Sequence, residues 1–177
     1  MILSVGIKQE SMAPRADRAS FCGILMSEIG LWEGWVMATG YFLKLVYQTD
    51  HSYPKEYIHF SEGEKAQAQR FAGCRGFLLY ETGAGPSPVS RTIFAKGQVA
   101  SPAVLENRAK DHNDRLFPLA VPMELHFCLS RRCEGVPLDR VRAILGVRNI
   151  QRRGGLLELT GEQFETLSRE LYVCGQE

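Results

Sequence analysis

Two short apolar runs separated by a turn-rich break form the clearest pattern in the chain. Residues 76–80 are apolar and aromatic-rich, and residues 92–100 are rich in β-branched side chains. Glycine, proline and serine dominate residues 83–90 between them. Because such residues end strands and form turns, the pattern predicts two adjacent strands, at residues 76–81 and 92–100.

Two further stretches have the character of strands. Residues 41–47 form an apolar, aromatic-rich run whose alternate positions face opposite sides of a sheet. Residues 117–128 are also apolar, but they contain Pro118 and Pro122, which suit an edge or kinked strand better than a helix. The four segments together predict one curved sheet that closes into a small barrel.

Capping-box spacing marks the starts of two helices. In a capping box, the first residue and the residue three positions later satisfy each other's backbone N–H groups. The chain contains two such pairs, Ser61 with Glu64 and Thr160 with Gln163. They predict helices over residues 61–72 and 160–172.

A third helix is predicted over residues 137–145, where an initial proline precedes apolar positions at helical spacing and a glycine follows. Residues 48–59 are interpreted as a polar, aromatic loop, and residues 101–115 fit a short helix or a long loop equally well. The mixture of elements predicts an α+β fold, a pseudo-β-barrel flanked by helices.

Residues 1–38 lack a clear hydrophobic period and mix charged with apolar pieces. They predict a poorly ordered N-terminal extension ahead of one domain that covers residues 39–174. Met37 stands just before the first predicted strand, and we hypothesise that it is the native start of the chain.

A local excess of arginine lies behind the formal net charge of +1. Between residues 130 and 155, seven arginines oppose only Glu134 and Asp139. Such a stretch attracts a polyanion, but arginines also form ordinary ion-paired surface, and the sequence leaves both interpretations open. Within it, the loop at residues 145–155 offers guanidinium forks that match phosphate oxygens. The predicted phosphate-binding residues are Arg148, Asn149, Arg152 and Arg153.

The composition argues against several classes of protein. The five cysteines are odd in number and form no C-x-x-C pair, so neither a disulfide framework nor a metal site is expected, and no cofactor is predicted. No apolar run approaches the roughly 18 residues of a membrane span, and the first residues lack the features of a secretory signal. We therefore expect a cytoplasmic protein that does not bind membranes.

No catalytic constellation can be assembled from the sequence, because the four histidines are scattered and no two have H-x-x-x-H spacing. A small nuclease remains an alternative, with Glu81, His126 or Lys96 as the reacting group. Another alternative is a module that binds an acidic protein partner through its arginine-rich face.

Several strings resemble the EVE branch of the PUA-like superfamily, a relative of the YTH domains. They are YFLK at residues 41–44, GFLLYET at 76–82, TIFAKGQV at 92–99 and the stretch from 146 to 164. The resemblance covers about residues 39–174. Such domains are pseudo-barrels that hold a flipped, often modified base in a slot. The resemblance therefore implies a reader of DNA or RNA with no catalysis of its own.

Carried over by position, the resemblance implies a base slot lined by Tyr41, Lys44, Tyr80 and Thr82. Tyr41 begins the first predicted strand and Tyr80 ends the second. If these strands pair antiparallel, both rings lie at one mouth of the barrel and can flank a base. The alternative is that the two tyrosines fill the core, which is the usual fate of aromatic residues in strands.

Overall fold

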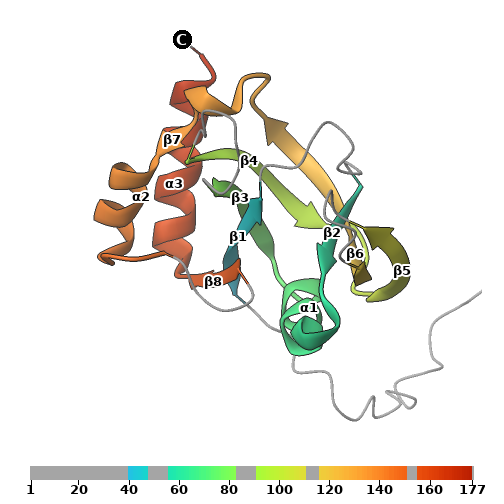
Figure 1. Ribbon diagram of the computed structural model, residues 1–177. Coiled ribbons are helices and arrows are strands. Elements are labelled where there is room, and N and C mark those ends of the chain that lie inside the picture. The colour runs from blue at the N-terminus through green and yellow to red at the C-terminus, as the bar shows by residue number, and fades with distance from the viewer. Residues whose placement is uncertain (1–39, 48–55, 83–90, 111–115, 151–154, 177) are drawn as a thin grey trace, which may run out of the picture. The chain divides into compact units, whose positions relative to one another are not determined.

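The computed structural model describes residues 40–47, 56–82, 91–110, 116–150 and 155–176, all within the compact unit Trp35–Glu177. The predicted N-terminal extension and the Met37 hypothesis lie outside the described residues. An eight-stranded sheet carries three α-helices (Figure 1). The strands are β1 (Tyr41–Tyr47), β2 (Tyr57–Phe60), β3 (Gly76–Thr82), β4 (Thr92–Val99), β5 (Leu105–Lys110), β6 (Leu116–Cys128), β7 (Val136–Pro137) and β8 (Leu156–Leu159). The helices are α1 (Lys65–Ala72), α2 (Leu138–Leu145) and α3 (Gly161–Cys174), with short 3-10 helices η1 (Glu62–Glu64) and η2 (Arg132–Glu134).

The α+β class predicted from the sequence is confirmed. The strands are ordered β2-β6-β4-β3-β1-β8, with β5 paired to β6 and β7 paired to β4. All four predicted strands belong to this one sheet, as β1, β3, β4 and β6. The terminal strands β2 and β8 do not pair with each other, so over the described residues the sheet is open and the predicted closed barrel is wrong.

The first two predicted strands, β1 and β3, pair parallel and not antiparallel. The chain between them passes through β2 and α1 and returns to the same end of the sheet, which a parallel connection requires. The register pairs Tyr41 with Gly76 and Leu45 with Tyr80. Tyr41 and Tyr80 are therefore four positions apart along the strands, about 13 Å at the usual rise. The expectation that both rings lie at one mouth of a barrel is wrong.

Four of the described strands were not predicted. The two-residue strand β7 pairs with β4 at the place where the helix over residues 137–145 was predicted to begin. β2 occupies the end of the segment interpreted as a loop, and β5 occupies part of the segment that fitted a helix or a loop. β8 follows the glycine pair of the arginine-rich loop and adds to β1 in antiparallel fashion. β2, β5 and β8 extend the sheet at or near its ends.

The predicted helices are confirmed, and their starts follow the predicted capping chemistry. Thr160 Oγ1 accepts from the backbone N–H of Gln163 at 3.2 Å, while Gln163 Oε1 accepts from the backbone N–H of Thr160 at 3.0 Å. Glu64 Oε2 accepts from the backbone N–H of Ser61 at 2.9 Å, and η1 leads from there into α1. The helices that the structure describes are too short or too polar to cross a membrane.

The sheet carries a separate hydrophobic cluster on each side. One, on what we call the α3 face, contains Leu43, Leu78 and Leu167. The other, on what we call the α1 face, contains Phe42 and Phe77. Successive side chains of a strand point to opposite faces, so β1 contributes alternately to both clusters.

Candidate functional site

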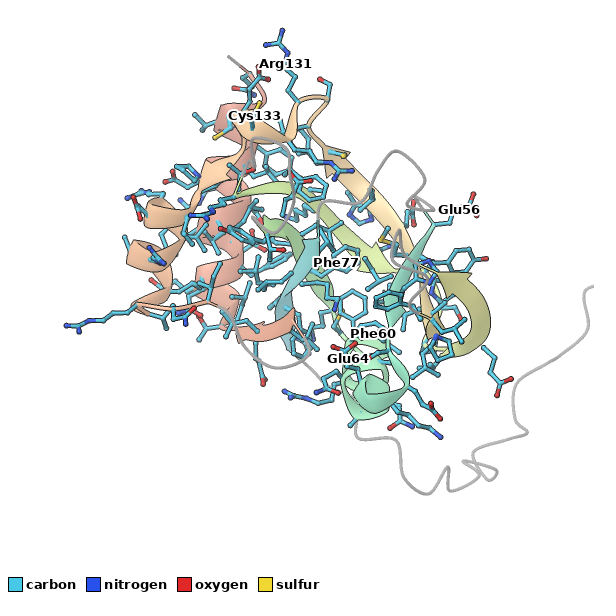
Figure 2. The ribbon with its side chains drawn as sticks, in the orientation of Figure 1. Glu56, Phe60, Glu64, Phe77, Arg131 and Cys133 are labelled. Atoms are coloured by element: carbon cyan, nitrogen blue, oxygen red, sulfur yellow. The ribbon has the colours of Figure 1, made fainter. Side chains whose placement is uncertain are left out.

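Lys44 is a lysine in the middle of an apolar strand, and its side chain is buried. The residue is 6% exposed, and its Nζ lies 4.4 Å from the centroid of the Phe60 ring. Burial lowers the pKa of Lys44 to about 8, and the nearby Glu64 carboxylate opposes that shift. Phe60 belongs to the α1-face cluster, so Lys44 points to the α1 face. Figure 2 shows Phe60 and Glu64 beside α1.

Gly155, the residue before β8, also lies close to the Lys44 amine. Its φ is 57°, in the left-handed region that favours glycine. A Cβ atom there would lie 3.2 Å from the carbonyl oxygen of Leu45 and 3.6 Å from Lys44 Nζ. Lys44 is thus close both to the end of β2 and to the start of β8, the two terminal strands of the sheet.

The other residues of the predicted base slot have different surroundings. The Tyr41 ring stacks on Phe164, with centroids 4.2 Å apart and an interplanar angle of 17°. Tyr80 is 3% exposed within the α3-face cluster, and burial raises its pKa. Thr82 Oγ1 donates to the carbonyl oxygen of Val46 at 3.2 Å. The structure therefore places Lys44 on one face of the sheet and the two tyrosines on the other.

Most of the described arginines in the arginine-rich stretch form ion pairs. The pairs are Arg131 with Glu134 at 2.7 Å, Arg132 with Glu81 at 2.6 Å, Arg140 with Glu170 at 2.6 Å and Arg142 with Asp139 at 3.4 Å. Two of the acidic partners lie outside the stretch, so the count of charges within it overstates the local excess. Ion-paired surface therefore describes Arg131, Arg140 and Arg142, whereas Arg132 pairs with a carboxylate that is only 5% exposed.

The predicted phosphate-binding residues lie between α2 and β8. Arg148 and Asn149 are exposed, shortly after the left-handed Gly146 that ends α2. Arg152 and Arg153 lie outside the described residues, but in the sequence they precede Gly155 by three and two positions. The predicted phosphate-binding segment therefore leads directly to the glycine beside Lys44.

Glu81 is a second buried polar group on the α1 face, and the sequence had suggested it only as a reacting group of the alternative nuclease. The Glu81 side chain is 5% exposed and accepts from Arg132, whose guanidinium carbon lies 4.6 Å from the centroid of the Phe94 ring. In the parallel register, Glu81 pairs with Val46 and Leu79 pairs with Lys44. Glu81 is thus two positions beyond Lys44 along the neighbouring strand, on the same face. A carboxylate inside an apolar strand was the signal in the sequence.

The candidate reacting groups of a nuclease do not form one site. Lys96 Nζ lies 4.9 Å from the Phe164 ring centroid and 5.5 Å from that of Tyr172, on the α3 face, whereas Glu81 lies on the α1 face. His126 is exposed on β6. Within the described ranges, no three acidic, histidine or cysteine side chains are grouped to hold a metal ion.

Comparisons with known proteins give little additional information. No family model matches the chain, and no curated protein matches it. Among solved structures, the chain is similar to the X-ray crystal structure of a Pseudomonas putida protein, a target of the Northeast Structural Genomics Consortium. The similarity has 17% sequence identity and a TM-score of 0.46 and covers 73% of this chain and 97% of that chain. That level of similarity assigns neither a family nor a function.

Proposed function

We propose that this chain is an EVE-like reader of DNA or RNA that binds one flipped, modified base next to Lys44. The observation that carries the proposal is the position of the Lys44 amine, which lies under the Phe60 ring and beside the glycine that ends the arginine-rich loop. The resemblance of the strand sequences to EVE domains supports the same role.

The chemistry of Lys44 suits recognition of a base edge. The Lys44 amine is held beside the Phe60 ring, with the Glu64 carboxylate nearby. Lysine offers three N–H donors, and bases present oxygen and nitrogen acceptors on their edges. Enzymes and binding proteins that handle a flipped base read it by such hydrogen bonds. In this proposal Lys44 is the donor, while Tyr41 and Tyr80 support the α3 face.

The loop that ends at Gly155 would bind the backbone of the same nucleotide. Arg148, Arg152 and Arg153 can neutralise phosphates, and the Asn149 amide can donate to them. These contacts would provide affinity without reading sequence, whereas Lys44 would provide selectivity for the base.

The test is a binding panel of fluorescent single- and double-stranded DNA and RNA oligonucleotides, with and without methylated or hydroxymethylated bases. The wild-type chain should prefer one modified oligonucleotide, and Lys44→Met should reduce that preference at least tenfold. Lys96→Met is the matched control, because Lys96 also lies over aromatic rings but on the α3 face. Absence of binding to every oligonucleotide, or unchanged preference in Lys44→Met, would refute the proposal.

A further inference from the structure

The Glu81–Arg132 ion pair joins β3 to the turn η2 across 51 residues of sequence. Arg132 Nη1 donates to Glu81 Oε1 at 2.6 Å, and the Phe94 ring lies under the guanidinium group. The carboxylate is 5% exposed, but the Arg132 side chain is 37% exposed. One partner is therefore fixed inside the protein while the other reaches the surface.

The backbone of Arg132 is held as well. Thr92 Oγ1 donates to the carbonyl oxygen of Arg132, and the turn passes so close to β4 that a Cβ atom on Gly135 would lie 2.0 Å from the carbonyl oxygen of Ile93. Arg132 is thus restrained at its main chain, at the face of its guanidinium group and at one edge of that group. An arginine restrained in this way loses little conformational entropy when it binds a further ligand.

The Glu81–Arg132 ion pair is not explained by its contribution to the stability of the fold alone. Burying a carboxylate with a guanidinium group often gives no more stability than apolar residues of the same volume would give. What the pair does provide is a fixed orientation for a planar group with five N–H donors. Arg132 Nη1 donates to Glu81, and 37% of the Arg132 side chain is exposed. The other N–H groups of the guanidinium can therefore donate to an anion. A guanidinium fork matches phosphate oxygens bidentately.

We propose that Arg132 contacts a backbone phosphate of the nucleic acid, a role that rests on the proposed function of the chain. Glu81 lies on the same face as Lys44 and two positions further along the neighbouring strand, about 8 Å away by strand geometry. In this proposal Arg132 anchors the phosphodiester backbone on the same face of the sheet, while Lys44 reads the base. Figure 2 shows the turn that contains Arg131 at the far end of the sheet from α1.

Neighbouring Arg131 provides a matched control. Its side chain is 76% exposed and pairs with Glu134 on the surface, three positions away. Arg131→Met and Arg132→Met remove the same charge from the same turn. If Arg132 contacts a phosphate, Arg132→Met should weaken binding of the preferred oligonucleotide about tenfold. It should also reduce the slope of log affinity against log salt by about 0.7–0.9. Arg131→Met should leave both the affinity and the slope close to wild type.

Removing Arg132 alone leaves the Glu81 carboxylate buried without this partner and can unfold the protein. The double variant Glu81→Gln/Arg132→Met removes both charges and avoids that problem. We expect it to melt close to wild type and to bind as weakly as Arg132→Met, with the base preference retained. Arg132→Lys keeps the charge but loses the fork, so it should retain the salt slope and lose about threefold in affinity.

A folded double variant that binds with wild-type affinity and salt slope overturns the role of Arg132 and leaves the proposed function intact. Loss of base preference without a change in the slope also overturns it, because that result makes Arg132 a base contact. If the wild-type chain binds no oligonucleotide, both this inference and the proposed function fail.

Discussion

Lys44 Nζ lies 4.4 Å from the centroid of the Phe60 ring, although the strands that carry the two residues, β1 and β2, do not pair. In the order of the sheet, three strands separate β2 from β1. The sheet must therefore curl until its α1 face is concave and residues near its two ends meet. The buried amine lies where they meet, so the energetics of Lys44 should report on this part of the fold.

The first prediction concerns the pH dependence of stability. The pKa of Lys44 falls from 10.5 to about 8 on folding, so between these values the unfolded chain binds more protons than the folded chain. Stability must then rise with pH across that window, and the contribution of Lys44 is most unfavourable below about pH 8. Relative to Lys44→Met, the wild type should gain about 2–3 kcal/mol in free energy of unfolding from pH 7 to pH 10.

Urea denaturation of both proteins at pH 7 and pH 10 measures this difference. Tyr80 and Cys74 have raised pKa values, so their contributions fall as pH rises. Both groups are present in both proteins, and their effects cancel when the variant is subtracted. A difference that does not change with pH would show that Lys44 is well solvated in the folded state.

The sequence predicted those elements whose pattern lies within a single continuous segment, and it did not predict those that depend on a distant strand. The long strands at residues 41–47 and 92–99 and the capping box at Thr160 are local patterns, and each was recognised. β2 has only four residues, in a polar context, and β5 reads LENRAK, with no apolar alternation. Such strands form because a neighbour, β6, supplies hydrogen-bond partners. That is a tertiary effect, which local propensity does not contain.

The candidate site shows the same limit. Lys44 was predicted as a site residue, and a lysine inside an apolar strand is visible in the sequence. Alternation gives the face of each side chain but not the neighbouring strand, so the parallel pairing that separates Tyr41 from Tyr80 could not be read. The Glu81–Arg132 pair spans 51 residues, and no pattern in either segment points to the other.

The second prediction concerns Tyr80, which the structure places in the α3-face cluster. Tyr80→Ala should reduce the free energy of unfolding by about 3–5 kcal/mol, because it leaves a large cavity in a packed core. Tyr80→Phe keeps the ring and should have a much smaller effect. Thermal melts and oligonucleotide titrations of the same variants provide the measurement. Normal stability with lost binding in Tyr80→Ala would instead assign the ring to a base slot.

The third prediction concerns the close approach of η2 to β4. Gly135→Ala would place a Cβ atom 2.0 Å from the carbonyl oxygen of Ile93, a backbone atom that cannot move alone. We expect a loss of more than about 3 kcal/mol in the free energy of unfolding, at or above the upper end for overpacked positions. Gly63→Ala is the control, since nothing lies within 4 Å of its added Cβ. Equal stability of the two variants would contradict the packing at Gly135.

The last prediction concerns the reactivity of Cys74. Burial is the main cause that raises the pKa of this thiol from 9.0 to about 12, and alkylation requires the thiolate. A rise of about three units lowers the thiolate fraction roughly thousandfold near pH 8. Iodoacetamide should therefore modify Cys74 at least about a hundredfold more slowly than the exposed Cys133, as followed by mass spectrometry of tryptic peptides. In guanidinium chloride the two cysteines should react at similar rates, because unfolding removes the burial that separates them. Rapid modification of Cys74 in the native protein would mean that the segment between α1 and β3 opens to solvent. Slow modification that becomes rapid on unfolding would show that the packing between α1 and β3 protects the Cys74 thiol.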